Sequence, residues 1–144
     1  MITSRRSLLK LMAGAVGGLM LGRVPMARTA PRYISHRPPI GQRKFVSPAV
    51  EALIARTKAK IGDHELAWLF ENCYPNTLDT TVQLGSLGGK PDTFIVTGDI
   101  DAMWLRDSSA QVWPYVSLAA HDEALRRLFR GLIHRHARCI SIDP

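Results

Sequence analysis

The apolar residues between positions 122 and 136 are the feature that most constrains the fold of this chain. They recur every three or four positions, the spacing that places side chains on one face of an α-helix. The face consists of Leu125, Leu128, Phe129, Leu132, Ile133 and, at its end, His136. Asp122 stands just before it and is suited to cap the helix N-terminus. Because such a face must be covered by other elements, the sequence predicts a packed helical domain.

Two earlier segments carry the signals of helix starts and ends. Ser47 and Pro48 suit the cap and the first turn of a helix that is expected to end near Gly62. Asp63 suits the cap of a second helix, which we expect to stop at Pro75 because proline lacks the backbone N–H. The chain therefore predicts two short helices in succession.

The middle of the chain predicts a small β-hairpin and a third helix. Strand-favouring residues at 80–84 and 93–96 flank a glycine-rich turn at 85–89. A helix is then expected from Asp107 to Ala120, with a kink at Pro114. Its predicted apolar face consists of Ala110, Val112, Trp113, Val116 and Leu118. The predicted fold class is all-α with a small β-hairpin.

The formal charge of +7 is concentrated in one region of the 144-residue chain. Residues 1–44 contain nine Lys or Arg and no Asp or Glu, whereas residues 45–144 contain ten basic and 12 acidic residues, a net charge of −2. The body thus lacks the basic face that nucleic-acid binding requires. We expect no nucleic-acid partner.

Residues 1–30 have the character of an export signal. Arg5 and Arg6 precede an uncharged, apolar segment from Leu11 to Gly22, which is short for a bilayer-spanning helix. Paired arginines in this setting resemble a twin-arginine signal peptide, so we expect the twin-arginine export machinery as a partner, no stable membrane anchor, and a periplasmic or secreted product. An ordinary secretory signal and an uncleaved anchor are the alternatives. The segment 31–46, rich in proline and without apolar periodicity, is predicted to be a linker.

The cysteines and histidines give no sign of a metal or cofactor site. Cys73 and Cys139 lack neighbouring cysteines at metal-ligand spacing and are expected to be free, small, buried thiols. His134 and His136 are two positions apart on a predicted helix and so face different sides. We expect no cofactor and no bound metal.

Five residues within nine positions form the candidate binding site: Asp99, Asp101, Trp104, Arg106 and Asp107. Carboxylates accept hydrogen bonds from sugar hydroxyls, a guanidinium donates them in a fixed fork, and an indole offers a flat apolar face to a sugar ring. Charged partners make these bonds stronger than neutral ones. The cluster therefore predicts sugar binding.

Each of these residues also has a purely structural interpretation. Asp107 could cap a helix, Arg106 could pair internally with Asp101, and Trp104 could belong to the core. The crowded polar segment 71–80 has two interpretations of equal weight, either a second wall of a sugar pocket or a well-capped turn.

Two long motifs resemble glycoside hydrolase family 125. They run from Glu71 to Thr81 (ENCYPNTLDTT) and from Phe94 to Ser108 (FIVTGDIDAMWLRDS), and the resemblance extends over residues 45–144. Members of this family are metal-independent, inverting exo-α-1,6-mannosidases. The resemblance therefore implies an enzyme that acts on α-mannosides or mannose-containing glycans. It also implies an (α/α)6 toroid of paired helices, of which residues 47–144 would be an N-terminal fragment of the catalytic domain.

The resemblance also implies roles for individual residues. The five residues of the cluster would build the subsite that holds the terminal mannose. The family's general acid and base are expected beyond residue 144, so no catalytic residue is assigned within this chain. Two alternatives remain: a truncated, non-catalytic product or carbohydrate-binding fragment, and a related (α/α)6 α-glucosidase of the glucoamylase type.

Overall fold

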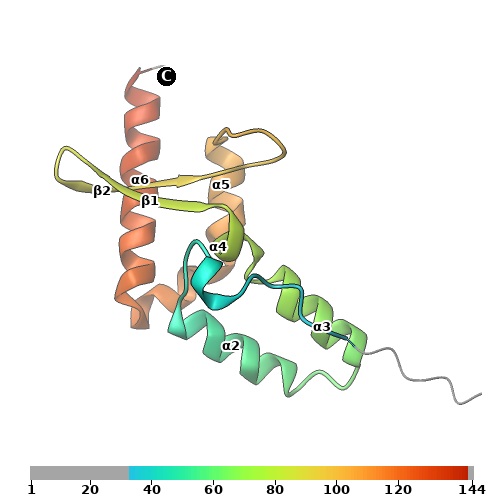
Figure 1. Ribbon diagram of the computed structural model, residues 1–144. Coiled ribbons are helices and arrows are strands. Elements are labelled where there is room, and N and C mark those ends of the chain that lie inside the picture. Colours follow the sequence, from blue (N-terminus) through green and yellow to red (C-terminus); the bar gives the residue numbers. More distant parts are fainter. Residues whose placement is uncertain (1–32, 143–144) are drawn as a thin grey trace, which may run out of the picture. The chain divides into compact units, whose positions relative to one another are not determined.

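The computed structural model describes residues 33–142, and the predicted signal peptide of residues 1–30 lies outside them. The elements in chain order are η1 (Ile40–Gln42), α2 (Pro48–Lys58), α3 (His64–Cys73), α4 (Asn76–Thr80), β1 (Val82–Leu87), β2 (Lys90–Ile95), α5 (Leu105–Val112), η2 (Trp113–His121) and α6 (Glu123–Ile142). Figure 1 shows helices around a single two-stranded sheet. The predicted fold class, helical with a small β-hairpin, is confirmed.

All three predicted helix caps are confirmed. Ser47 Oγ accepts a hydrogen bond from Val50 N at 3.2 Å at the start of α2. Asp63 accepts two bonds from first-turn N–H groups of α3 at 2.8 and 3.0 Å. Asp122 Oδ1 accepts a bond from Leu125 N at 2.9 Å at the start of α6. Each cap satisfies N–H groups that have no partner inside the helix.

The hairpin is longer than predicted, and its turn is shorter. A short helix, α4, occupies residues that sequence patterns placed partly in a strand. Strands β1 and β2 then pair antiparallel from Val82↔Ile95 to Leu87↔Lys90. The turn comprises only Gly88 and Gly89, with φ of 58° and 75°. Tight hairpins of this kind need positive φ at both central residues, which glycine adopts without strain.

Helix α6 lies across the hairpin and makes the main tertiary contact of the fold (Figure 1). Thr93 Oγ1 donates a hydrogen bond to Leu128 O at 3.0 Å, and Gly131 lies directly against Thr93. Arg135 forms an ion pair with Asp92. The buried core draws on α2, α4, both strands, α5, η2 and α6, together with the residue Phe45 before α2. It consists of Phe45, Val50, Ile54, Leu78, Val82, Ile95, Val112, Tyr115, Leu125, Leu128 and Leu132.

The prediction of one α-helix from Asp107 to Ala120 is wrong, both in the type of helix and in the face that is buried. The chain is α-helical only to Val112 and continues as the 3-10 helix η2. Trp113 and Val116 are 74% and 46% exposed, whereas Tyr115 is buried. A 3-10 helix has three residues per turn, so the face that points inward shifts away from the α-helical pattern.

The predicted burial of the two cysteines is also wrong. Cys73 and Cys139 are both free, as expected, but both are exposed. Cys73 lies on α3, a helix without a buried residue, and Cys139 lies in the last part of α6, beyond the stretch that packs on the hairpin. Both thiols are accessible because, in the part of the chain that the structure describes, no other element packs over them.

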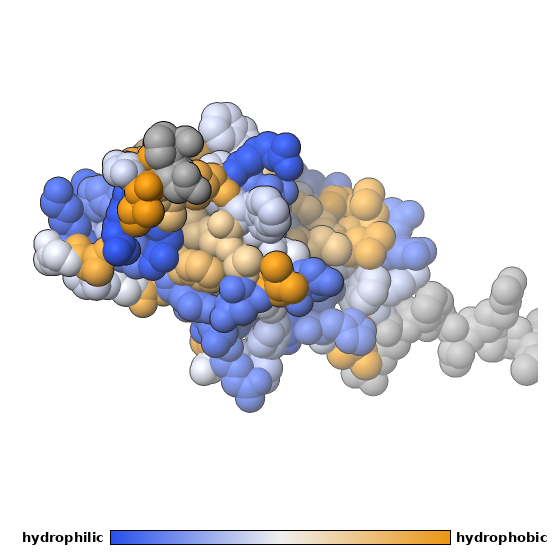
Figure 2. Space-filling model, turned by 90° about the horizontal axis from the view of Figure 1, so that it is seen from above, coloured by the Kyte–Doolittle hydropathy of each residue, from blue (hydrophilic) through white to orange (hydrophobic). Residues whose placement is uncertain are grey.

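Several apolar side chains remain at the surface. Leu66 and Leu69 of α3 are 54% and 41% exposed. They line an open groove of about 590 Å³ together with Phe70 and, from the other side, Ala110 and Pro114. Figure 2 shows hydrophobic residues among the hydrophilic ones on one face of the molecule. These apolar side chains of α3 are therefore not covered by another element of the described residues 33–142. Within residues 33–142 no helix is both long enough and apolar enough to span a membrane.

Candidate functional site

The loop between β2 and α5 carries the first three candidate residues and is held by Thr97. Thr97 is 3% exposed, and its N–H donates to Ala102 O at 2.8 Å. Its hydroxyl accepts a hydrogen bond from Trp104 N at 2.8 Å and donates to Ala102 O at 3.2 Å. Gly98, with φ of 87°, turns the chain directly after Thr97. These bonds close the loop on itself around one buried threonine.

The closed loop presents its middle residues to solvent. Asp99 and Asp101 are exposed, as is Ile100 between them, which is 59% exposed. Trp104, at the end of the loop, is 63% exposed. An indole with that much accessible surface can accept the apolar face of a sugar ring without displacing protein atoms.

The other two candidate residues lie on the first turn of α5. The side chain of Arg106 is 92% exposed and that of Asp107 is 45% exposed. The Nη2 atom of Arg106 is 3.6 Å from Oδ2 of Asp107. Such an exposed ion pair adds little to stability, so both groups can bind a ligand at small cost to the fold.

The structure differs from the three structural interpretations of the cluster, which were a helix cap at Asp107, an Arg106–Asp101 ion pair and a core position for Trp104. Asp107 makes no capping hydrogen bond, because Trp104 occupies the cap position of α5 and no side chain caps that helix. Among residues 33–142, Arg106 pairs with Asp107 and not with Asp101. Trp104 is not in the core. The structure brings the five residues together on one loop and the adjoining helical turn, and their role in sugar binding stays a prediction.

Ser108 on this turn pairs with the half-buried His136, a pair that was not predicted. Ser108 is fully buried, and its Oγ is 2.9 Å from Nε2 of His136 on α6. Burial lowers the pKa of His136, which favours the neutral ring. The helical spacing placed His136 on the inner face of its helix, but it gave no sign that the partner is Ser108.

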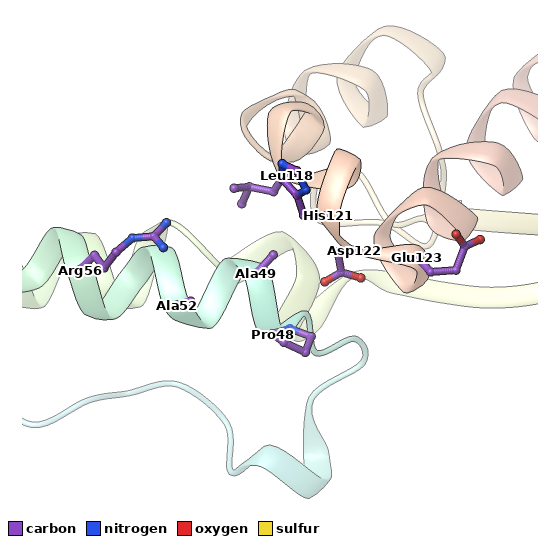
Figure 3. Close-up of a pocket in the computed structure, with 8 residues that line it drawn as sticks. All are labelled: Pro48, Ala49, Ala52, Arg56, Leu118, His121, Asp122 and Glu123. Carbon is purple, nitrogen blue, oxygen red and sulfur yellow. The ribbon is translucent and has the colours of Figure 1, made fainter.

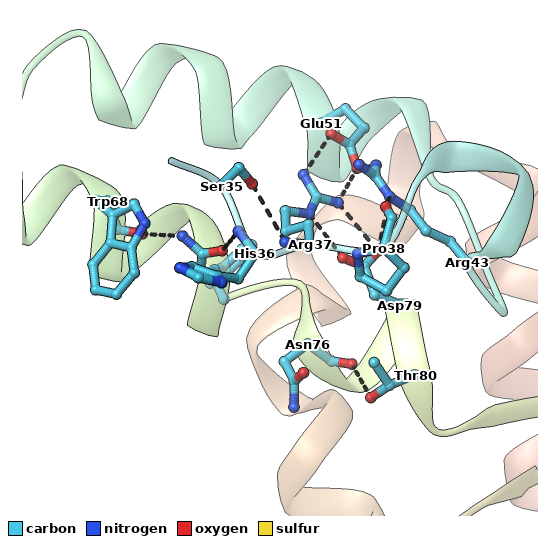
Figure 4. A network of polar contacts seen from close by, with 12 residues as sticks. Ser35, His36, Arg37, Pro38, Arg43, Glu51, Trp68, Asn76, Asp79 and Thr80 are labelled. Carbon is cyan, nitrogen blue, oxygen red and sulfur yellow. Dashed lines mark hydrogen bonds and ion pairs between the residues drawn. The ribbon is translucent and has the colours of Figure 1, made fainter. Parts of the chain in front are cut away.

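Arg37 is the main polar residue that sequence patterns missed (Figure 4). It lies in the predicted linker, yet only 6% of its side chain is exposed. Its Nε donates to Asp79 Oδ2 at 2.7 Å, and its two Nη atoms donate to Glu51 at 2.9 and 2.6 Å. Burial alone would lower the pKa of Arg37, but the bonds to Glu51 and Asp79 outweigh burial and raise it. Residues 33–45 are therefore held against the helices by Arg37. The sequence of this segment has no apolar periodicity that would predict such contacts.

Asn72 and Asp79 of the polar segment 71–80 bind groups of the protein itself, whereas Cys73, Asn76 and Thr80 are exposed. Asn72 Oδ1 accepts a hydrogen bond from His36 N at 2.7 Å, and its amide donates to Trp68 O at 2.7 Å. Asp79 is 3% exposed and faces Arg37. Of the two interpretations, these contacts favour the well-capped turn over a second wall of a sugar pocket.

A separate hollow of about 530 Å³ lies between α2 and the start of α6 (Figure 3). Asp122 is its most buried polar group, and that carboxylate already accepts a bond from Ser47 Oγ at 2.6 Å. Burial opposes ionisation of Asp122, but the bonds from Ser47 and from backbone N–H groups prevail and lower its pKa. The hollow therefore has no buried polar group free to bind a ligand.

Potential metal ligands are dispersed. Among residues 33–142, no group of three or more His, Cys, Asp or Glu side chains could hold a metal ion. His134 Nδ1 lies 3.0 Å from Pro91 O, whereas His136 faces Ser108, so the two histidines point to different sides as predicted.

Comparison with known proteins gives a family for this chain. The family described as "Metal-independent alpha-mannosidase (GH125)" matches residues 63–144, more than half of the chain. A curated relative, the "Meiotically up-regulated gene 157 protein" of Schizosaccharomyces pombe (strain 972 / ATCC 24843), is 42% identical over 125 residues, which cover 85% of this chain and 25% of the relative. The chain thus spans about a quarter of that relative's length. The matched region contains both the Asp99–Asp107 cluster and the helix that supports it. This chain therefore belongs to glycoside hydrolase family 125, the metal-independent α-mannosidases.

Proposed function

We propose that this chain provides the mannose-binding part of an inverting exo-α-1,6-mannosidase that releases terminal mannose from α-mannosides or mannose-containing glycans. Membership of the family supports a glycoside hydrolase that acts on mannosides. The observation that carries the proposal is the accessible Arg106–Asp107 pair, which adjoins the exposed indole of Trp104.

The charges in the cluster match the hydroxyl rim of a terminal sugar. Arg106 donates hydrogen bonds, Asp107 accepts them, and a hydroxyl can do both, so adjacent side chains can bind two adjacent hydroxyls. Asp99 and Asp101 on the preceding loop add further acceptors. Trp104 stacks against the apolar face of the same ring. Together they would fix the non-reducing end of the substrate.

Hydrolysis with inversion requires two carboxyl groups on opposite sides of the scissile bond. One protonates the departing oxygen, and the other activates water on the opposite face of the sugar, with about 6.5–9.5 Å between them. Asp99 and Asp101 lie two positions apart on one exposed loop. We assign them to substrate binding and place the general acid and base outside the residues of this chain.

The proposal extends to the larger protein. Residues 47–144 would form part of an (α/α)6 toroid, with residues 1–30 a twin-arginine signal, residues 31–46 a linker, and a periplasmic or secreted product. The uncovered apolar stripe of α3 supports this architecture, because paired helices of a toroid cover each other's stripes. The length of the curated relative is consistent with it.

The test compares α-1,6-mannobiose hydrolysis by the full-length protein, which would also carry the general acid and base, and by its Arg106→Ala and Asp107→Ala variants. Loss of one charged hydrogen-bond partner should cost about 1.5–3 kcal/mol, which lowers kcat/KM about ten- to hundredfold. Arg127→Ala is the control, because Arg127 is exposed and forms no ion pair with residues 33–142. Unchanged kcat/KM in both site variants would refute the assignment of the sugar-binding residues.

The same assay separates the alternatives. Release of glucose from maltose with no release of mannose would indicate an α-glucosidase of the glucoamylase type. Binding of mannose without hydrolysis of any α-mannoside would indicate a non-catalytic carbohydrate-binding product.

A further inference from the structure

The segment that carries Trp104, Arg106 and Asp107 is held at both ends by buried hydroxyl groups. At its start, Trp104 N donates to Thr97 Oγ1 at 2.8 Å. At its end, Ser108 N donates to Trp104 O at 2.9 Å, and Ser108 Oγ lies 3.1 Å from Leu105 O. Thr97 is 3% exposed and Ser108 is fully buried, so solvent does not compete for either hydroxyl.

Ser108 also connects this segment to a second helix. Its Oγ lies 2.9 Å from Nε2 of His136 on α6. A serine hydroxyl has one proton, so Oγ either donates to Leu105 O and accepts from Nε2–H, or donates to Nε2 of the other tautomer. In both arrangements the first turn of α5 is fixed to α6, which in turn packs on the hairpin.

We propose that Thr97 and Ser108 are positioning residues for the bound mannose: their hydroxyls fix Trp104 and the Arg106–Asp107 turn in the orientation that binds the sugar. This inference rests on the proposed function. It assigns roles to two buried side chains that do not themselves reach the sugar.

The contacts of Thr97 distinguish positioning from general stabilisation. Among the described residues 33–142, its hydroxyl bonds only to Ala102 O and Trp104 N of the same loop. Thr97→Val keeps the shape of the side chain and removes both bonds, whereas Thr97→Ser keeps the hydroxyl. The two variants therefore separate the hydroxyl from the volume of the side chain.

Ser109 provides a matched control for Ser108. Its Oγ donates to the same carbonyl, Leu105 O, at 2.9 Å, but Ser109 is exposed and makes no contact with His136. Ser108→Ala and Ser109→Ala remove the same chemical group from adjacent positions of one helical turn. Only the first removes the connection to α6.

The experiment measures hydrogen exchange and kinetics in the full-length protein. Exchange at the Trp104 amide reports the Thr97 bond without any sugar, and we expect it to accelerate in Thr97→Val and to remain slow in Thr97→Ser. For α-1,6-mannobiose, kcat/KM should fall about tenfold or more in Thr97→Val and Ser108→Ala, because small misplacements of binding groups are costly. Thr97→Ser and Ser109→Ala should stay within about twofold of the unmodified protein. Circular dichroism at the assay temperature establishes that each variant is folded.

The outcomes are distinguishable. Folded Thr97→Val and Ser108→Ala variants with unchanged kcat/KM would overturn the positioning roles and leave the proposed function intact. An unmodified protein that neither binds nor hydrolyses α-mannosides would overturn the proposed function, and the positioning roles with it. A fall of kcat/KM in Thr97→Val that Thr97→Ser does not share would support the inference, since a loss of packing alone would instead affect Thr97→Ser, which lacks the methyl group.

Discussion

Gly131 of α6 lies against Thr93 of β2 with no space for a side chain between them. A Cβ atom at position 131 would lie 2.9 Å from Thr93 N and 3.0 Å from the carbonyl carbon of Asp92, and it would overlap Thr93 Oγ1. Backbone atoms cannot rotate out of the way, so any side chain here would push α6 away from the hairpin. The contact matters for the site because α6 also holds His136 under the α5 turn.

Replacement of this glycine tests the packing directly. Gly131→Ala should lower the free energy of unfolding by about 1–3 kcal/mol, the usual cost of overpacking. Denaturant unfolding followed by circular dichroism measures it. Gly62→Ala is the control, because a Cβ at Gly62 meets no atom within 4 Å. Equal stability of the two variants would show that α6 and the hairpin are not in close contact.

The buried ion pair of Arg37 gives a second prediction. The side chains of Arg37 and Asp79 are 6% and 3% exposed. Arg37→Met would remove both hydrogen bonds to the buried Asp79 carboxylate and leave it only the longer ion pair with Arg43, at 3.7 Å. Breaking a buried pair costs about 3–5 kcal/mol. Thermal unfolding should show a large loss of stability, whereas Arg127→Met on the exposed face should change little. A small effect of Arg37→Met would mean that residues 33–45 are not fastened to the helices as described.

The same network predicts how stability changes with pH. Hydrogen bonds from Arg37 are the main cause that holds the pKa of Glu51 below its ordinary value of 4.5. Because the folded-state pKa is the lower one, this contribution is complete above pH 4.5 and is lost as the pH falls through the folded-state value. Asp122, whose pKa is also lowered, acts in the same direction. In Glu51→Gln the loss of stability between about pH 5 and pH 3 should be smaller than in the unmodified protein. If the free energy of unfolding of Glu51→Gln fell as steeply between about pH 5 and pH 3 as that of the unmodified protein, this role of Glu51 would be excluded.

Two exposed tryptophans allow a matched test of ring stacking. Trp104 and Trp113 are 63% and 74% exposed and stand before and after α5. Trp104→Ala should weaken binding of methyl α-mannoside about five- to tenfold, because an aromatic contact contributes roughly 1–1.5 kcal/mol. Trp113→Ala should leave the affinity unchanged. Isothermal titration calorimetry measures both, and equal effects would remove Trp104 from the site.

Local signals in the sequence predicted the helix starts well. Ser47, Asp63 and Asp122 are caps, and capping depends on a side chain and the N–H groups two or three residues after it. The hairpin was predicted for the same reason, since its turn requires glycine. Features that depend only on neighbouring residues can be inferred from sequence.

Long-range contacts could not be predicted in this way. The pairing of Arg37 with Asp79 joins residues 42 positions apart, and the pairing of Ser108 with His136 spans 28. Tyr115 is buried because η2 is not α-helical and because its hydroxyl donates to Tyr74 O. Each of these depends on how distant elements meet in the fold, for which the chain offers no periodic signal. The candidate site was found because its residues are neighbours in sequence.

Hydrolysis of α-1,6-mannobiose by the full-length protein with Arg106→Ala, Asp107→Ala or the Arg127→Ala control is the most direct test of the sugar-binding site. We predict that kcat/KM falls about ten- to hundredfold in the first two variants and is unchanged in the control, with all three folded. Activity in the two site variants equal to that of the unmodified protein would contradict the account, because the exposed pair would then have no part in binding the sugar.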